Sequence, residues 1–596
     1  MLVVVDFPEL GMRTSRFRRG APHGVVVGAD GARVVFLRSA GRFDDAAGLW
    51  TLSVATGVER QVAAGPVTGF GIDRDARVAA FAVDGRLFRV DLVDGGATEI
   101  ATPEPALDPR PSPSGRHIGY TTPADCLRIT DGESDELLAG EPDGSSWRDP
   151  GGVAWGVADP AGREFGRHRG WWWAPSGAQV LAARTAGSVT LHLLDLDGGW
   201  VDVHWDRETY PYLVDVHWAD GGTPLITVLR RLQQHGLVLS VDPRTGETQV
   251  HAELADARWV EPIPGTPRHL PDGRVLVGGE LAHDGFDARC LFADGSLLTP
   301  PGLYIRRVIG VLPRKGAPAA GPDLVVEATD GDPAARDMFR IRTSLGGGSA
   351  EAVRLAPARE AAVGGDVLVL GSEVRRGGAV VHTIESLAEP LPYTPHPILE
   401  RVTDRRVPTA VLYPTDHVGG SRLPVLLTFG DGPGHQQVTA DAADWQERQW
   451  WAESGFAVVS VDPRGTPGVA PSYEKVVHRR LADVPLADCF GALQALHGKH
   501  TDLDLSRVAV LGRGLGGWLA GLAVTRHGDV VRCGVARDPV TDWSSLPAAF
   551  AERYLGRLTD SPDIYAHHQL DLPHPLLLTS PATLDQELAF IRNALP

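Results

Sequence analysis

The stretch RVAVLGRGLGGWLAGLAVTRHG, residues 507–528, decides the fold of the C-terminal part of this 596-residue chain. Val508 to Leu511 form a short apolar run typical of a buried strand, and LAGLAVTRHG has the length and composition of a helix. The segment GRGLGG between them is rich in glycine, which permits the positive φ angles and close backbone approaches of a sharp turn. We therefore predict a strand, a tight turn and a helix in this order.

Similar strands and helices alternate around this unit. Apolar runs occur at PTAVLYP (408–414), PVLLTF (424–429), FAVVSVD (456–462) and HPLLL (574–578), and helical stretches at AADWQERQWWAESG (442–455) and VPLADCFGALQALHGKH (484–500). Continuous apolar strands separated by helices indicate a mainly parallel sheet that is covered on both faces. The C-terminal part is therefore predicted to be an α/β domain.

The sequence before this domain repeats a different phrase, a turn on Asp-Gly or Ser-Gly followed by a short β-branched strand. Examples are GADGARVVFLRS (28–39), SPSGRHIGYTT (112–122) and LPDGRVLVGGE (270–280). Asp-Gly and Ser-Gly are hairpin signals, and many short strands with almost no helical periodicity favour a β-propeller. We predict a propeller of about seven or eight blades in residues 1–388 and the α/β domain in 389–596, with a pair of stacked sandwiches as the alternative to the propeller.

Composition limits the classes of partner and the compartment. The chain carries 57 basic and 75 acidic side chains, a formal charge of −18, which repels phosphate backbones and anionic lipids. We expect no nucleic-acid or membrane partner. The first residues have neither the order nor the length of a signal peptide, and the four cysteines show no C-x-x-C spacing, so we expect a reduced, cytoplasmic protein with no metal site and no cofactor.

The glycine-rich turn stands where an α/β-hydrolase carries its nucleophile. That fold places a serine in a G-x-S-x-G motif on the turn between a strand and a helix, and here the serine position is Gly514. Glycine has no hydroxyl, so no acyl-enzyme can form there. A phosphate-binding loop is the alternative interpretation of the turn, but a Gly-Lys-Ser/Thr sequence or a dinucleotide fingerprint is missing.

Four further segments make a family resemblance specific. They are VDPRGTPG (461–468), HRRL (478–481), DPVTDW (538–543) and ERYLG (552–556). In order and spacing they are similar to segments of the dipeptidyl peptidase IV branch of the prolyl oligopeptidase family, which are serine peptidases. The resemblance implies a propeller, a hydrolase domain and an activity on short peptides.

The resemblance also identifies positions that depart from the family pattern. In the propeller the family holds the substrate's amino group with two adjacent glutamates, where this chain has Arg163 and Glu164. A cation beside the remaining carboxylate repels an ammonium, so we expect weak amine binding or none. We expect Glu164 to form a surface ion pair with Arg163 or Arg167 instead.

The hydrolase positions implied by the resemblance are also altered. Gly430 stands where the family has a tyrosine that donates to the oxyanion, and Leu515 follows the nucleophile position. Two tyrosines of the proline pocket correspond to Leu546 and Phe550. With Trp543, these two residues are the candidates for an apolar substrate pocket without hydroxyls.

The largest departure from the family pattern concerns the acid and the base of the catalytic triad. Asp585 lies one position from where the family's aspartate belongs, and no histidine follows Leu578. We therefore expect a hydrolase domain with a shortened C-terminal end and no general base. His567, His568 and His574 precede the last strand, and we expect them on a surface loop.

These observations leave three interpretations of function. The first is a catalytically deficient relative of the serine peptidases. The second is a propeller-based module that binds peptides or a protein partner, with a homodimer also conceivable because relatives dimerise through the hydrolase domain. The third is an active serine hydrolase whose nucleophile has not been recognised, with Ser544, Ser545 and Ser580 as stray hydroxyls.

Overall fold

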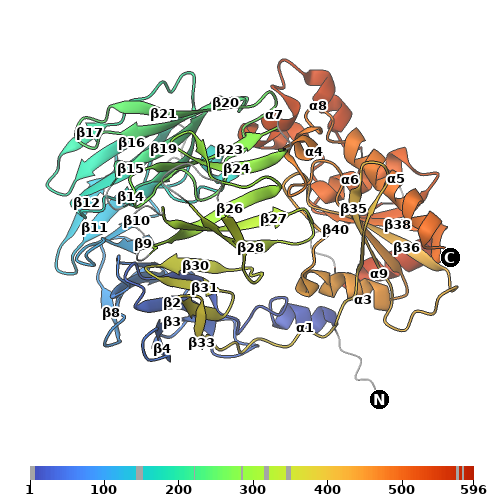
Figure 1. The fold of residues 1–596 in the computed structure, drawn as a ribbon, viewed down its shortest axis with the longest axis horizontal. Coiled ribbons are helices and arrows are strands. Elements are labelled where there is room, and N and C mark those ends of the chain that lie inside the picture. The colour runs from blue at the N-terminus through green and yellow to red at the C-terminus, as the bar shows by residue number, and fades with distance from the viewer. Residues whose placement is uncertain are drawn as a thin grey trace.

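The computed structural model describes residues 7–141, 152–219, 222–282, 286–314, 321–343, 351–571, 576–579 and 583–595. Figure 1 shows two domains side by side, a ring of sheets and an α/β sheet flanked by helices. None of the helices in the described part of the chain combines the length and the apolar character that crossing a bilayer requires.

The first domain is an eight-bladed β-propeller, which confirms the predicted architecture. Among the described residues, each blade is a four-stranded antiparallel sheet, except that the fourth blade has five strands. The strands of the first four blades are β1 (His23–Val27), β2 (Arg33–Ser39), β3 (Ala47–Ser53), β4 (Val58–Ala63), β5 (Phe70–Ile72), β6 (Val78–Val83), β7 (Arg86–Asp91), β8 (Ala97–Ile100), β9 (Leu107–Pro111), β10 (Ile118–Thr121), β11 (Leu127–Thr130), β12 (Asp135–Ala139), β13 (Ala154–Trp155), β14 (Trp171–Trp173), β15 (Gln179–Ala186), β16 (Ser188–Asp195) and β17 (Trp200–Asp202). Those of the last four are β18 (Tyr212–His217), β19 (Leu225–Leu229), β20 (His235–Val241), β21 (Thr248–Ala255), β22 (Arg268–His269), β23 (Val275–Leu281), β24 (Ala288–Ala293), β25 (Ser296–Leu297), β26 (Leu303–Leu312), β27 (Asp323–Asp330), β28 (Asp337–Arg342), β29 (Glu351–Arg354), β30 (Ala361–Gly364), β31 (Val367–Leu370), β32 (Glu373–Arg376) and β33 (Ala379–Thr383).

The Asp-Gly turns form the hairpins that the sequence predicts. Between β1 and β2, Gly31 has a φ of 68°, and the Asp30 carboxylate accepts a 2.8 Å hydrogen bond from the N–H of Ala32. An aspartate that holds its own turn and a glycine that supplies the positive φ are the two requirements of such a turn.

The ring closes by contact between its first and last blades, which lie side by side in Figure 1. Glu59 of β4 accepts hydrogen bonds from the His382 ring of β33, at 3.0 Å, and from the N–H of Glu385, at 3.0 Å. Arg38 of β2 binds the same carboxylate at 2.7 Å. One half-buried carboxylate therefore joins the two ends of the propeller.

The second domain contains a seven-stranded sheet in the order β34-β35-β37-β36-β38-β39-β40. The pairs β34–β35 and β35–β37 are antiparallel and the other pairs are parallel. The strands are β34 (Ile398–Val402), β35 (Val407–Leu412), β36 (Leu423–Phe429), β37 (Ala457–Val461), β38 (Leu503–Arg513), β39 (Val531–Arg537) and β40 (Leu576–Thr579). The helices of this domain are η1 (Ala442–Trp445), α3 (Gln446–Glu453), α4 (Pro471–Lys475), α5 (Asp483–Lys499), α6 (Leu515–Arg526), η2 (Trp543–Ser545), α7 (Ala548–Leu555), α8 (Pro562–His568) and α9 (Leu584–Ala594).

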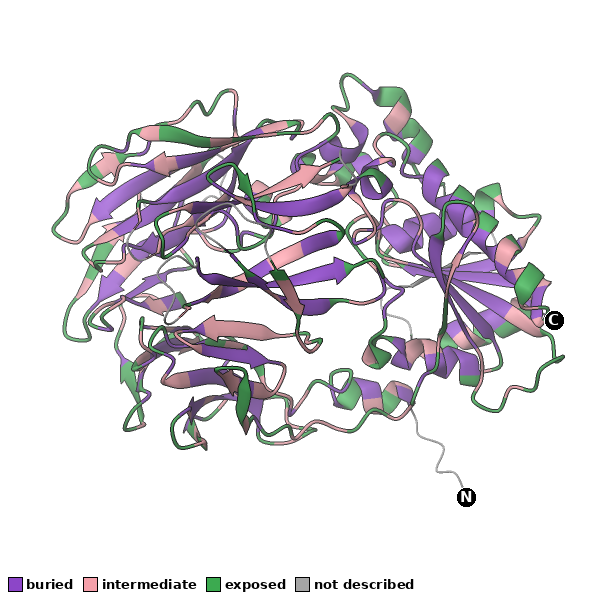
Figure 2. Ribbon diagram, viewed as in Figure 1, coloured by how far each residue is buried: buried purple, intermediate pink, exposed green. Residues whose placement is uncertain are grey.

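Alternate residues of the central strands enter two different cores. Val508 and Val510 pack with α5 and α6 on one face, whereas Ala509 packs with α3 and α9 on the other. Figure 2 shows the resulting band of buried strands through the middle of this domain. Burial on both faces explains why these strands are continuously apolar.

The N-terminal helix α1 (Phe7–Arg13) belongs to the core of the second domain. Its Phe7 ring lies 5.6 Å from the ring of Tyr393 and 6.5 Å from that of Trp450, centroid to centroid. The last blade ends at Thr383 and the hydrolase sheet begins at Ile398. From α1 onwards the chain thus leads from the core of the second domain through the propeller and back to the second domain.

Candidate functional site

The predicted turn between strand and helix is present and has the geometry of a nucleophile elbow. Gly514 links β38 to α6 with φ 54° and ψ −118°. Its N–H donates to the carbonyl of Arg537 at 2.9 Å, and its carbonyl accepts from the N–H of Trp518 at 3.0 Å. The backbone therefore makes the sharp, strained turn of the motif even though no side chain is displayed on it.

A carboxylate fills the space beside this glycine. A Cβ atom added to Gly514 would lie 2.2 Å from Oδ1 of Asp431, and the N–H of Leu515 donates to the same oxygen at 3.0 Å. In an elbow of this kind, the N–H of the residue after the nucleophile is a donor of the oxyanion hole. Asp431 thus fills the space of a nucleophile side chain and also binds one donor of the oxyanion hole.

The loop that carries Asp431 packs tightly on the elbow. A Cβ atom on Gly516 would lie 2.4 Å from the carbonyl oxygen of Gly430, and one on Gly432 would lie 2.4 Å from the Leu515 side chain. The side chain of Leu515 points into the core and is 8% exposed. Only small residues on both segments allow this approach, so the site residues Gly430 and Leu515 come together with Gly514.

The same loop carries a histidine that the sequence interpretation missed. Nδ1 of His435 would lie 3.3 Å from a Cβ atom on Gly430, and the ring interacts electrostatically with Asp431. His435 is exposed and lies only four residues after Asp431. The glycines and proline between them mark a tight loop that could have suggested their proximity.

The cavity against the elbow is very small. It measures about 30 Å³ and is bordered by Gly430, Asp462, Arg464 and Trp518. Sites that bind ligands in proteins usually measure about 300–1,000 Å³, and about 30 Å³ suits a single water molecule. The hollow that these described residues border is therefore too small for a peptide.

The residues expected to line an apolar pocket pack against one another instead. Trp543 is completely buried. Its ring stacks on Phe550 with centroids 6.2 Å apart and meets Trp518 edge-on at 5.1 Å. Leu546 and Phe550 are half-buried against the same core.

His568 is not on the surface, contrary to the expectation for the three histidines. It is 0% exposed, its Nδ1 lies 2.7 Å from the carbonyl of Ile564, and its ring stacks on Trp518. Burial lowers its pKa to about 4. The expectation was wrong for His568 because α8 packs onto α6. His567 is exposed and pairs with Asp483 at 2.9 Å, and His574 lies outside the described residues.

Asp585 lies in the first turn of α9 and is exposed. The buried acid of this helix is Glu587, whose two carboxylate oxygens accept hydrogen bonds from Nε and Nη2 of Arg537. Arg537 in turn accepts the N–H of Gly514 through its carbonyl oxygen. The helix therefore supports the elbow through Glu587, a residue that the sequence interpretation did not select.

The stray serines have local partners. The Ser544 hydroxyl donates to the Asp542 carboxylate at 2.7 Å, and the Ser545 hydroxyl donates to the Asp542 carbonyl at 2.6 Å. Both are exposed residues of η2. Ser580 lies outside the described residues.

The propeller segment expected to hold an amine forms helix α2 (Pro160–Glu164). Arg163 is exposed and Glu164 is half-buried. Arg167 is buried, pairs with Asp159 and donates to the carbonyl of Arg169 at 2.6 Å. The expected ion pair between Glu164 and Arg163 or Arg167 is absent from this described segment, because Arg167 turns inward and pairs with Asp159, the residue that caps the N-terminus of α2.

Comparison with known proteins places these features in context. Residues 442–583 match the model of the prolyl oligopeptidase family. Over 171 residues the chain is 29% identical to dipeptidyl peptidase family member 2 of Caenorhabditis elegans, covering 28% of this chain and 20% of the relative. Over 179 residues it is 30% identical to human dipeptidyl peptidase 8, covering 29% of this chain and 20% of the relative.

A third relative and a solved structure complete the comparison. The chain is 26% identical over 199 residues to rat inactive dipeptidyl peptidase 10, covering 32% of this chain and 25% of the relative. The matched segments thus span only a fifth to a quarter of these relatives. The crystal structure of Porphyromonas gingivalis dipeptidyl peptidase 4 aligns with a TM-score of 0.77 and 17% identity, over 99% of this chain and 94% of that chain, which shows a shared two-domain fold.

Proposed function

We propose that this chain, a dipeptidyl peptidase IV-like member of the prolyl oligopeptidase family by its hydrolase-domain sequence and its fold, has lost peptide hydrolysis at the elbow. One observation carries the proposal: the Asp431 carboxylate lies where a nucleophile side chain would project from position 514, and it accepts the N–H of Leu515. Position 514 therefore offers no hydroxyl for a serine-type attack, and the N–H of Leu515 is already bound by the carboxylate.

The chemical consequences of these two changes are large. Removing the serine of a triad costs about a millionfold in the turnover of subtilisin. Removing one oxyanion donor costs a further hundredfold or so in typical enzymes. A negative carboxylate at the oxyanion donor also repels the charge that develops on a substrate carbonyl during attack.

The names of the relatives include both a peptidase and an inactive protein. Dipeptidyl peptidase 8 is named as a peptidase, and dipeptidyl peptidase 10 is named as inactive. Family resemblance is therefore compatible with either outcome. The residues at positions 514 and 431 favour the inactive one.

A direct test combines a substrate with a covalent probe. The purified protein is incubated with a Gly-Pro chromogenic amide and with a fluorophosphonate, beside an active serine peptidase as the positive control. We expect no turnover and no labelling. Labelling of a serine whose replacement abolishes turnover would establish the alternative, an active hydrolase with another nucleophile.

The variant Gly514→Ser tests the role of Asp431. We expect it to remain unlabelled, because the new side chain would collide with the carboxylate that already binds Leu515. Fluorophosphonate labelling of this single variant would show that Asp431 does not block the elbow.

We also propose a cytoplasmic location. All four cysteines (Cys126, Cys290, Cys489 and Cys533) are free and buried, and burial raises the pKa of each thiol. Such inert thiols suit a reducing compartment. Cell fractionation of the source cells tests this proposal, and recovery outside the cytoplasmic fraction would refute it.

A further inference from the structure

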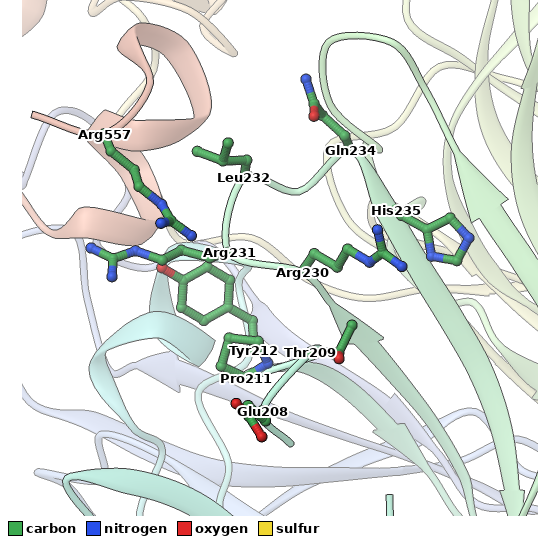
Figure 3. Close-up of a pocket in the computed structure, with 10 residues that line it drawn as sticks. All are labelled: Glu208, Thr209, Pro211, Tyr212, Arg230, Arg231, Leu232, Gln234, His235 and Arg557. Atoms are coloured by element: carbon green, nitrogen blue, oxygen red, sulfur yellow. The ribbon is translucent and has the colours of Figure 1, made fainter. Parts of the chain in front are cut away.

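A second hollow lies at the junction of the two domains, and its chemistry differs from that of the elbow. It measures about 690 Å³ and is bordered by the loop before β18, by the hairpin between β19 and β20, and by Arg557 just after α7. Its size falls within the usual range of ligand sites. Figure 3 shows Arg231 and Arg557 on the side of Tyr212, and Arg230 extending to the other side of the hollow, towards His235. We call it the arginine groove.

The lining carries an excess of positive charge. The lining residues include three arginines and one carboxylate, Glu208. Outside the lining, Asp206 interacts electrostatically with Arg230, and Asp560 with Arg231. Arg231 is engaged by Glu552 through two hydrogen bonds of 2.7 and 2.6 Å. Arg230 lies 5.4 Å from the centre of the Tyr210 ring, and neither Arg230 nor Arg557 forms an ion pair with any residue in the described ranges.

The side chains that line the groove carry a net positive charge, whereas the whole molecule is negative. The whole chain has a formal charge of −18, so its overall field repels anions. An anion that binds here must therefore be held by the groove itself. Guanidinium groups form forked hydrogen bonds with carboxylates and phosphates, and an aromatic ring offers apolar contact to the rest of a ligand.

We propose that the arginine groove binds an acidic peptide segment through Arg230 and Arg557. The groove has a volume of about 690 Å³, and Arg230 and Arg557, which form no ion pair within the described residues, lie on different domains. Tyr212, Pro211 and Leu232 supply apolar surface to the same lining. A peptide that bridges these arginines contacts the propeller and the hydrolase domain at once. The proposal does not depend on whether the elbow is active.

The test is a binding titration with defined probes. Rhodamine-labelled hexaglutamate is titrated with the full chain at low ionic strength, where surface electrostatics is least screened, and anisotropy reports the bound fraction. Hexaglutamine with the same dye measures attraction that does not depend on charge. Inorganic phosphate, added as a competitor, measures the response to a free oxyanion.

The decisive variant is Arg230→Gln/Arg557→Gln. Both side chains are exposed, so the variant is expected to fold, and its circular dichroism and melting temperature verify this. We expect its Kd for hexaglutamate to rise about tenfold or more, the loss typical of two charged hydrogen-bonding partners. The matched control is Arg116→Gln/Arg480→Gln, which removes one exposed arginine from each domain away from the groove and should change the Kd by less than about twofold.

Three results would overturn the proposal. Equal binding of hexaglutamate and hexaglutamine would show that charge does not matter. An unchanged Kd in the groove variant, or an equal loss in the control variant, would place the binding elsewhere. Binding of inorganic phosphate without binding of hexaglutamate would identify a free oxyanion, and not a peptide, as the ligand.

Discussion

The elbow and the domain interface use charge in opposite ways. At the elbow a single exposed carboxylate, Asp431, faces a glycine. At the interface, Arg289 of the propeller binds Glu474 of the hydrolase domain at 2.7 Å, and Lys475 binds Asp256 at 2.9 Å. Glu474, Lys475 and Arg289 are all less than a tenth exposed.

This difference shows which interactions hold the architecture. Buried charges cost free energy unless they are paired with good geometry, and the interface pairs them across two domains. The elbow keeps its backbone turn through backbone hydrogen bonds, close glycine contacts and the Arg537–Glu587 pair behind it. The shape of the active-site region can therefore persist without any reactive side chain.

The largest effect should come from breaking the interface pair. Glu474→Ala leaves the buried Arg289 without its two closest oxygens and also removes the partner of the Tyr304 hydroxyl. We expect a loss of about 3 kcal/mol in the free energy of unfolding, because an unpaired buried charge is strongly destabilising. Thermal unfolding of the full chain measures it.

The matched control for this prediction is Glu247→Ala, which changes an exposed propeller glutamate. It should change stability by about 0.5 kcal/mol or less. If the two variants melt at the same temperature, the interface pair does not hold the domains together.

An intermediate effect concerns two buried groups near the elbow with opposite pH dependence. Burial raises the pKa of Asp462 from its ordinary value of 3.8 to about 6, so its stabilising contribution is present below pH 3.8 and is lost as pH rises towards 6. Burial lowers the pKa of His568 from 6.5 to about 4, so its contribution is present above pH 6.5 and is lost as pH falls towards 4. The two contributions oppose each other in the wild-type protein.

Single variants separate these contributions. As the pH is raised from 4 to 6, the free energy of unfolding of Asp462→Asn, measured relative to wild type, should increase by about 1–3 kcal/mol. That of His568→Gln, also relative to wild type, should decrease by a similar amount. Urea unfolding at several pH values measures both. Parallel pH profiles for the two variants would contradict the assignment.

The smallest effect is expected at the elbow itself. Gly514→Ala forces a side chain into a positive φ and against Asp431, which should cost about 2 kcal/mol. Adding Asp431→Gly removes the collision but not the backbone strain, so a double-mutant cycle should give a coupling of about 1 kcal/mol. Urea unfolding of the four proteins in the cycle measures it.

The control for the elbow is Gly491→Ala in helix α5. A Cβ atom there meets nothing within 4 Å, so this variant should be neutral or slightly stabilising, as alanine favours helices. A cycle with no coupling would mean that Asp431 moves away from the elbow freely.

Local patterns were sufficient to predict much of this protein. The alternation of Asp-Gly turns with short strands predicted the propeller, and the continuous apolar runs predicted the parallel sheet. The glycine at position 514 was visible without any structure. His568 was misplaced because the residues before β40 carry no strong periodicity, and only the packing of α8 on α6 buries the ring.

The sequence by itself determined the two domains and the missing hydroxyl, because turn chemistry, hydrophobic period and the identity of one residue are local properties. Only the tertiary structure decided that Asp431 meets Leu515, 84 residues away, and that Arg230 and Arg557 share one groove. Contacts between residues so far apart depend on how whole domains pack, and no short stretch of sequence encodes them.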